Sequence, residues 1–270
     1  MYYIYLILAP LSSLAIALLL RVFEGKGFDR RVVIASNYIA AFLLGYFLSN
    51  QCYIPRIAYL LGIVIGLFFF INFVFLSKTI KALGVASTVT FSRLSLAIPV
   101  GFSIFLWGEK PLLLEIAALI VIVAVILLWE DKIGKISSGL FTVFLLFGLL
   151  DTALKFFKVK FQYVDDSAFL VVIYVSAGVW SWGYILFKRI KPVGKDFLGG
   201  LLLGIPNYFS SYFLLKAMKQ IPGFVVFPFN NIFLIIASAI TGVILFNETL
   251  SRRRILLIIL GIAAVGALAS

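Results

Sequence analysis

Ten long runs of apolar residues alternate with short gaps that hold most of the charged residues of the chain. A helix that crosses the hydrocarbon core of a bilayer, about 30 Å thick, needs roughly 20 apolar residues. The runs are close to that length, so the pattern predicts an all-α integral membrane protein with ten transmembrane helices. The expected spans are residues 3–20, 32–49, 57–76, 83–106, 112–129, 137–155, 167–188, 197–215, 222–246 and 254–269.

Composition agrees with a lipid environment. Apolar residues make up 63% of the chain and charged residues 13%, whereas soluble domains average about 45–50% and about 25%. The formal net charge of +12 lies mostly in the gaps between the apolar runs, as in membrane proteins, so we expect a lipid bilayer and no nucleic acid as the partner.

Several kinds of chemistry are excluded by residue types that the chain lacks. It has no His and a single cysteine, Cys52, which excludes imidazole metal sites and an internal disulfide. No nucleophile–base set and no phosphate-binding loop is recognisable. We therefore expect that the protein is not an enzyme and binds no cofactor or metal. We also expect a monomer or homodimer with a small-molecule substrate.

An internal repeat divides the chain into two halves. With an offset of about 138 residues, several positions of the first half match positions of the second. The pairs include Gly62 with Gly200, Gly66 with Gly204, Lys78 with Lys216 and, after a slip of one residue, Ser92 with Asn231 and Glu109 with Glu248. We predict two five-helix repeats, residues 1–134 and 135–270. Because five is odd, the second repeat enters the membrane from the opposite side, which gives an inverted-topology repeat typical of secondary transporters.

The five-plus-five pattern, with a Glu that opens the last span of each half, supports a family resemblance. The two segments are Gly108-Glu109-Lys110-Pro111 and Asn247-Glu248-Thr249-Leu250. Over nearly its whole length the chain resembles the EamA-like branch of the drug/metabolite transporter superfamily. The resemblance implies a central cavity lined by the third, fourth, eighth and ninth spans. The first span lacks the membrane Glu with which the small multidrug relatives exchange protons, so that mechanism does not carry over.

The loop charges predict an orientation. When residues at the very ends of spans are counted with the adjoining loop, fifteen Lys and Arg residues belong to the loops after odd-numbered spans and seven to the loops after even-numbered spans. By the positive-inside rule, both termini are then extracytoplasmic in a cell (plasma or inner) membrane. Many members of the family are thought to keep both termini in the cytoplasm. The loop charges and the family resemblance therefore predict opposite orientations.

Arg93 is the most informative single residue. It lies ten residues into the span 83–106, near the membrane midplane, where an Arg costs about 3 kcal/mol on insertion scales. It must therefore face a cavity or a partner, and its planar fork suits a carboxylate or phosphate. A structural ion pair inside the helix bundle is the alternative.

Other polar residues of the spans are candidates for the same site. Pro99, Pro206 and Pro228 interrupt three spans, and Pro99 is expected to free the carbonyl of Ser95. Interrupted helices at membrane depth point to a cavity, whereas Asn and Ser side chains can also join helices without any ligand. The candidate substrate-binding residues beside Arg93 are Ser92, Asn207, Asn230, Asn231, Asn72, Asn37 and Tyr38.

Asp151 lies within the span 137–155, and Lys155 follows four residues later. This order favours an ion pair on one helix. Alternatively, Asp151 is a cation or proton site, or the partner of Arg93. Glu109 and Glu248 precede their spans, where a carboxylate interacts favourably with the helix dipole. We interpret both as structural residues.

The leading functional hypothesis is a secondary transporter that works by alternating access around a central cavity. A midplane Arg favours a small polar metabolite with a carboxylate or phosphate, such as an amino acid or organic acid. Two alternatives remain open: a broad exporter of aromatic or amphipathic compounds, and a flippase or accessory subunit for a lipid-linked sugar.

Overall fold

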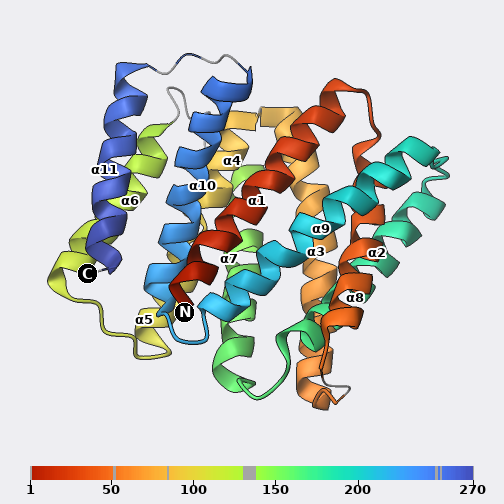
Figure 1. Ribbon diagram of the computed structural model, residues 1–270, viewed down its shortest axis with the longest axis horizontal. Helices are drawn as coiled ribbons and strands as arrows, with labels where there is room; N and C mark the ends of the chain where they lie inside the picture. Colours follow the sequence, from red (N-terminus) through yellow and green to blue (C-terminus); the bar gives the residue numbers. More distant parts are fainter. Residues whose placement is uncertain are drawn as a thin grey trace. The chain divides into compact units, whose positions relative to one another are not determined.

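The regular structure of the chain is α-helical throughout the part described by the computed structural model. That part comprises residues 2–50, 53–83, 85–129, 138–246, 249 and 251–269. It contains eleven helices (Figure 1): α1 (Tyr2–Gly25), α2 (Arg30–Leu48), α3 (Arg56–Leu83), α4 (Val85–Leu94), α5 (Ala97–Phe105), α6 (Leu113–Trp129), α7 (Ser138–Lys160), α8 (Asp166–Phe187), α9 (Gly194–Ala217), α10 (Gly223–Phe246) and α11 (Arg252–Ala269). Each predicted span overlaps one of these helices, except that 83–106 is divided between α4 and α5.

Within this part of the chain, eight helices are long and apolar enough to cross a membrane by length and composition, with Thr88–Phe105 counted as one span. Helix α6 is apolar but has only 17 residues, and α11 is not among the eight and begins with Arg252, Arg253 and Arg254. The chain is thus a multi-pass helical membrane protein, and the count of ten spans stays a prediction.

Local sequence signals set several helix ends. Asp29 is the N-cap of α2 and accepts a hydrogen bond from the amide of Arg31 at 2.9 Å. The Arg31 side chain also donates hydrogen bonds to this carboxylate. These bonds hold the pKa of Asp29 below its usual value. Asp165 caps α8 in the same way, through the amide of Ala168 at 2.9 Å. Such caps satisfy amides that have no partner inside the helix.

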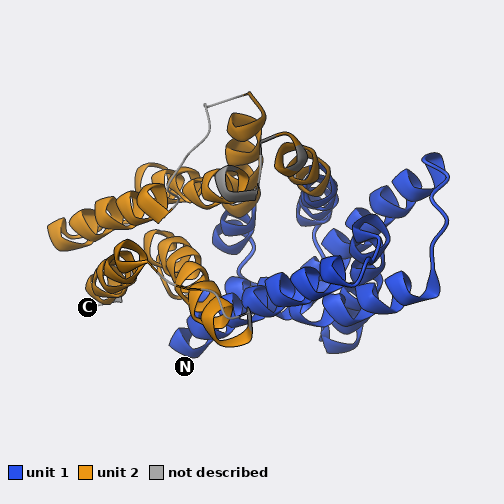
Figure 2. Cartoon of the chain, turned by 90° about the horizontal axis from the view of Figure 1, so that it is seen from above, with its two compact units in different colours: residues 1–71, 153–219 blue, residues 72–152, 220–270 orange. Residues whose placement is uncertain are grey.

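The chain divides into two compact units (Figure 2). Unit 1 consists of Met1–Ile71 and Ala153–Lys219, and unit 2 of Asn72–Thr152 and Gln220–Ser270. Each unit therefore takes segments from both predicted halves. The predicted boundary between residues 134 and 135 lies outside the described residues.

In unit 1, α9 packs on α1 and α2, and α2 also packs on α8. Glycines allow the closest approaches: a Cβ on Gly200 would lie 2.5 Å from the carbonyl oxygen of Val33, and one on Gly204 would collide with the carbonyl oxygen of Asn37. On α3, a Cβ on Gly66 would lie 2.5 Å from the carbonyl oxygen of Ile173 in α8. These glycines thus permit close packing between the helices of unit 1.

In unit 2, α6 packs on α11 and α4, and α10 packs on α5. Helix α7 approaches α5 at Gly148, where a Cβ would collide with the side chain of Ile98. Helix α3 is fixed to α7 by a hydrogen bond from Asn72 Nδ2 to the carbonyl of Leu146 at 3.3 Å. Helices α3 and α5 thus both contact α7 in unit 2.

A candidate solute-binding cluster in unit 2

The span that carries Arg93 is broken directly after this residue. Helix α4 ends at Leu94, residues 95 and 96 form a turn, and α5 begins at Ala97. The amide of Leu96 donates to the carbonyl of Arg93 at 3.2 Å. Arg93 therefore lies in the last turn of a helix, where the dipole favours a positive charge.

The effect of Pro99 differs from the prediction that the carbonyl of Ser95 becomes free. Pro99 has no N–H to donate to this carbonyl, but the amide of Ile98 donates to it instead, at 3.0 Å. The tighter turn thus replaces the missing helical bond. The span is interrupted here, but the Ser95 carbonyl keeps a hydrogen-bond partner. It is therefore not left free for a ligand.

Arg93 is joined to α10 by a hydrogen bond. Its Nη1 donates to Oδ1 of Asn231 at 3.2 Å. Asn231 is buried, and its Nδ2 donates to the carbonyl of Phe227 at 2.9 Å. The amide of Asn231 is thereby fixed with its oxygen towards the guanidinium. Sequence analysis grouped Arg93 with Asn231, and the structure brings the two into contact.

Asp151, on α7, is the acidic neighbour of Arg93. The two side chains attract each other electrostatically, yet among the described residues they form no direct ion pair, and the Asp151 side chain makes no hydrogen bond there. The attraction without contact leaves both groups open to a third partner. The three predicted roles of Asp151 stay predictions.

Three further candidates lie in unit 2. Ser92 donates to the carbonyl of Val89 at 2.7 Å, within its own helix. Asn72 and Asn230 each have a buried Oδ1 that accepts no hydrogen bond from the described part of the chain. A buried polar atom without a partner requires an explanation, such as a water molecule or a ligand. These two oxygens are therefore acceptors that a solute with donor groups can satisfy.

The remaining substrate-binding candidates, Asn37, Tyr38 and Asn207, lie in unit 1 and contact other groups of the protein there. Asn207 Nδ2 donates to Oδ1 of Asn37, whose own Nδ2 donates to the carbonyl of Ile34. Tyr174 donates to the carbonyl of Asn207 at 3.1 Å and stacks on Tyr38, with ring centroids 6.1 Å apart. This arrangement fits the alternative interpretation of these residues, in which polar side chains join helices.

Lys155 also lies in unit 1, where it is buried at 5% exposure and has a partner. Its ion pair with Asp151 stays a prediction.

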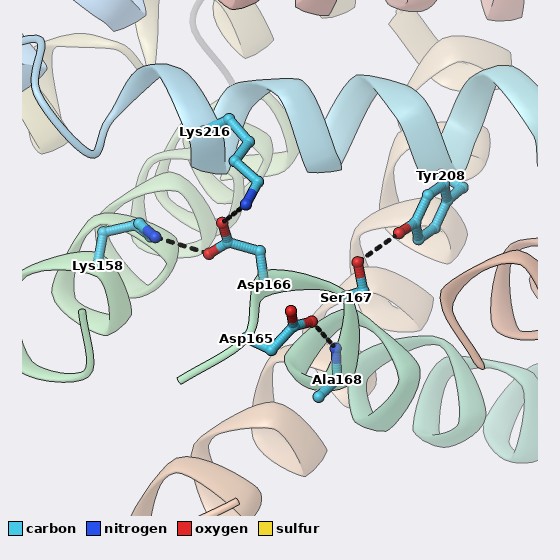
Figure 3. A network of polar contacts seen from close by, with 7 residues as sticks. All are labelled: Lys158, Asp165, Asp166, Ser167, Ala168, Tyr208 and Lys216. Atoms are coloured by element: carbon cyan, nitrogen blue, oxygen red, sulfur yellow. Dashed lines mark hydrogen bonds and ion pairs between the residues drawn. The ribbon is translucent and has the colours of Figure 1, made fainter. Parts of the chain in front are cut away.

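Sequence analysis missed a buried ionic network at one end of unit 1 (Figure 3). Asp166, in the first turn of α8, binds Lys158 of α7 at 2.6 Å and Lys216 of α9 at 3.3 Å. Next to it, Tyr208 donates to Ser167 at 2.8 Å. These residues lie at the ends of spans, where charges are ordinary, so only the pair Asp165-Asp166 at a helix start could have indicated the network.

No family model matches the sequence. Individual proteins do match it. An uncharacterized protein of Haemophilus influenzae is 27% identical over an alignment of 286 positions, gaps included, that covers 96% of this chain and 95% of that protein. Proteins of Bacillus cereus and Bacillus anthracis named "Putative sugar uptake protein" are 25% identical over 219 residues, which cover 75% of this chain and 74% of theirs.

One solved crystal structure has the same fold, with a TM-score of 0.79 over 98% of this chain and 95% of that one, at 16% sequence identity. At that identity the likeness concerns the fold alone. Weak homology to sugar uptake proteins and the many apolar helices together indicate a multi-pass membrane transporter.

Proposed function

We propose that this protein is a secondary transporter that binds a small polar solute at the cluster formed by Arg93, Asp151, Asn231, Asn72 and Asn230. The observation that carries the proposal is the position of Arg93. It lies at the break of a membrane span, is fixed by Asn231, and is attracted by Asp151 without touching it. Charged residues inside spans mark substrate and ion pathways by default.

The chemistry of the cluster favours a neutral solute that carries hydroxyl groups. Arg93 and Asp151 balance each other in charge, so a net anion gains at the guanidinium but is repelled by the carboxylate. A hydroxyl group donates and accepts, so the hydroxyl groups of one solute can accept from Arg93 and donate to Asp151. The buried Oδ1 atoms of Asn72 and Asn230 are further acceptors in unit 2. Sugars have this chemistry, and the Bacillus relatives carry the name of sugar uptake proteins.

A solute with a carboxylate or phosphate is the second candidate, and one observation favours it. Only one bond of the guanidinium, from Nη1 to Asn231, is formed among the described residues. The planar fork of Arg93 thus keeps further donors for a bidentate partner.

Alternating access by two inverted five-helix repeats, ten spans in all, is part of the proposal. Within unit 1, helix pairs exchange as a two-fold axis requires: Gly66 of α3 packs on α8, and its repeat-related Gly204 of α9 packs on α2. Helices α2 and α8 are themselves related by the offset of about 138 residues. In unit 2, Arg93 contacts Asn231, the predicted repeat counterpart of its neighbour Ser92. These contacts support the internal duplication, the feature through which the chain resembles the EamA-like transporters.

Uptake by the purified full-length protein in liposomes tests the proposed function. The panel contains neutral hexoses and pentoses, hexose phosphates, organic acids and amino acids. We expect saturable uptake and counterflow of a neutral sugar, well above protein-free liposomes. Uptake of anionic solutes alone would support the second candidate, and no uptake of any panel member would contradict the proposed function.

A further inference from the structure

Helices α1 and α9 pack against each other in unit 1 (Figure 1), and an open groove is lined by these two helices. The groove has a volume of about 690 Å³, within the usual range of ligand sites. Its apolar lining includes Leu11 and Ala15 of α1 and Leu202, Ile205 and Phe209 of α9. Leu11, Leu202 and Ile205 are 42%, 50% and 45% exposed, so the described part of the chain does not cover this apolar surface.

The polar solute of the proposed function does not suit this groove. Among the described residues that line it, only Ser12 is polar, and its hydroxyl donates to the carbonyl of Leu8 at 2.9 Å. A solute with several hydroxyl groups would lose hydrogen bonds to water here without replacing them. Both helices are long and apolar enough to cross a membrane, so the groove lies at the depth of the lipid chains and suits an apolar occupant.

The groove leads to a lysine at the end of α1. Val22 follows the lining residue Leu18 by four positions, and Lys26 follows Val22 by four. Residues three or four positions apart share one face of a helix, and the amide of Lys26 still donates to the carbonyl of Val22 at 3.1 Å. Val22 and Lys26 are exposed. The face of α1 that lines the groove thus changes from apolar to basic where the helix ends.

Helix α9 changes in the same way at its start. Leu198 precedes the lining residue Leu202 by four positions, Lys195 precedes Leu198 by three, and both are exposed. The Lys195 ammonium donates to the carbonyls of Lys26 and Gly27 at 3.5 and 3.1 Å, which places the start of α9 beside the end of α1. An ammonium has three donors, so Lys195 keeps one for an anion. Both walls of the groove therefore lead to an exposed lysine at the same end.

The charges of these two lysines are not balanced by the acids nearest to them in sequence. Glu24 and Asp29 pair with arginines at the start of α2, and Asp196 is buried. Neither Lys26 nor Lys195 forms an ion pair with a described residue. Basic residues next to the ends of spans attract anionic lipid headgroups, so this end of the groove favours a negatively charged group.

We propose that the groove between α1 and α9 is a binding site for one anionic phospholipid, with an acyl chain along the groove and the phosphate at Lys26 and Lys195. The acyl chain covers the exposed apolar lining, and the phosphate oxygens accept hydrogen bonds from the two ammonium groups. This site is separate from the solute-binding cluster of unit 2, and the inference does not depend on which solute is carried.

A second copy of the chain suits the groove less well. A symmetric dimer brings the same patch of both copies together, and two copies with the same orientation in a membrane bring it together at the same depth. The lysines of both copies would then meet at one end of the interface without acids to pair them. A phospholipid instead supplies a negative charge at that end and an apolar chain for the groove.

Native mass spectrometry of the purified full-length protein in detergent tests the proposal, with phosphatidylglycerol and phosphatidylcholine of identical acyl chains as probes. We expect one phosphatidylglycerol per chain, bound at least about tenfold more tightly than phosphatidylcholine, because each lysine near a membrane surface strengthens binding of an anionic lipid about fivefold. The double variant Lys26→Gln/Lys195→Gln should lose this preference. The control Lys110→Gln/Lys188→Gln removes two exposed lysines outside the groove and should keep it.

A variant of the groove tests the acyl chain separately. Ala15→Phe places a ring in the groove, and we expect the affinity for both lipids to fall at least about fivefold at an unchanged melting temperature. The lysine variant changes only exposed side chains, so it decides the test even if Ala15→Phe disturbs the packing of α1.

Three results would overturn the proposal. The first is equal affinity of wild type and Lys26→Gln/Lys195→Gln for phosphatidylglycerol. The second is displacement of bound phosphatidylglycerol by an equal concentration of glycerol phosphate, which would identify a site for free phosphate without the groove. The third is a lipid-free dimer that Ala15→Phe dissociates, which would identify a second copy of the chain as the occupant.

Discussion

Arg93 is acceptable at membrane depth because its charge has three compensating features. An Arg inside a span costs about 3 kcal/mol. A hydrogen bond to Asn231, the attraction of Asp151 and a position in the last turn of α4 offset this cost. These features are compatible both with solute binding and with a purely structural role. The two roles differ in how they respond to replacement by lysine.

Arg93→Lys keeps the charge but loses the fork with several donors. If Arg93 binds solute, we expect transport to fall by at least about tenfold, equivalent to about 1.4 kcal/mol, with a melting temperature close to that of wild type. Arg93→Ala should abolish transport. Uptake and thermal melting are measured on the same purified proteins.

Arg31→Lys is a matched control, because Arg31 pairs with Asp29 at the start of α2 through a 2.6 Å contact and belongs to no candidate site. Transport by this variant should stay near the wild-type rate. Tolerance of lysine at position 93, combined with a lower melting temperature for Arg93→Ala, would identify Arg93 as a structural residue instead.

Sequence patterns identified Arg93, Asn231 and Asp151 because polar residues stand out in an apolar span. They could not reveal that Asn37 and Asn207 bond to each other, since that contact depends on the packing of α2 on α9. For the same reason the network of Lys158, Asp166 and Lys216 was missed. A polar residue in a span is visible in sequence, but its partner is a property of the folded chain.

At the scale of the elements, helix ends and close helix contacts differ most from expectation. Glu109 was expected to favour the start of its own span. Instead it accepts hydrogen bonds from the amides of Gly223 at 2.9 Å and Phe224 at 3.2 Å, at the start of α10. The first amides of α10 lack helical partners, whereas α6 begins four residues after Glu109. Glu248 lies outside the described residues.

The glycines on α9 provide a prediction for helix packing. Gly204→Ala places a methyl group against the backbone of α2 at Asn37 and Ala41. Because backbone cannot move aside as a flexible side chain can, we expect a loss of about 1–3 kcal/mol in stability, measured as a lower melting temperature in detergent.

Gly183→Ala is the matched control for this substitution, since a Cβ on Gly183 would meet no atom within 4 Å. Its melting temperature should equal or exceed that of wild type, because alanine is the better helix former. Equal melting temperatures for the two alanine variants would show that α2 and α9 are not in the close contact described.

At the scale of the whole molecule, apolar runs were sufficient to locate the helices but not to define the compact units. Run length is a local property, and the predicted spans 3–20, 32–49 and 57–76 each coincide with a helix. The division into units cuts through α3 and α7, and it depends on contacts between segments far apart in sequence. The orientation of the termini and the ten-span count stay predictions.

The central claim is that the cluster around Arg93 binds the transported solute. An experimental structure of the protein with that solute bound tests it most directly. The account predicts solute density within hydrogen-bond distance of the Arg93 guanidinium, with Asn231 and Asp151 beside it. Solute density enclosed by other residues, with Arg93 still bonded only to protein, would contradict the account.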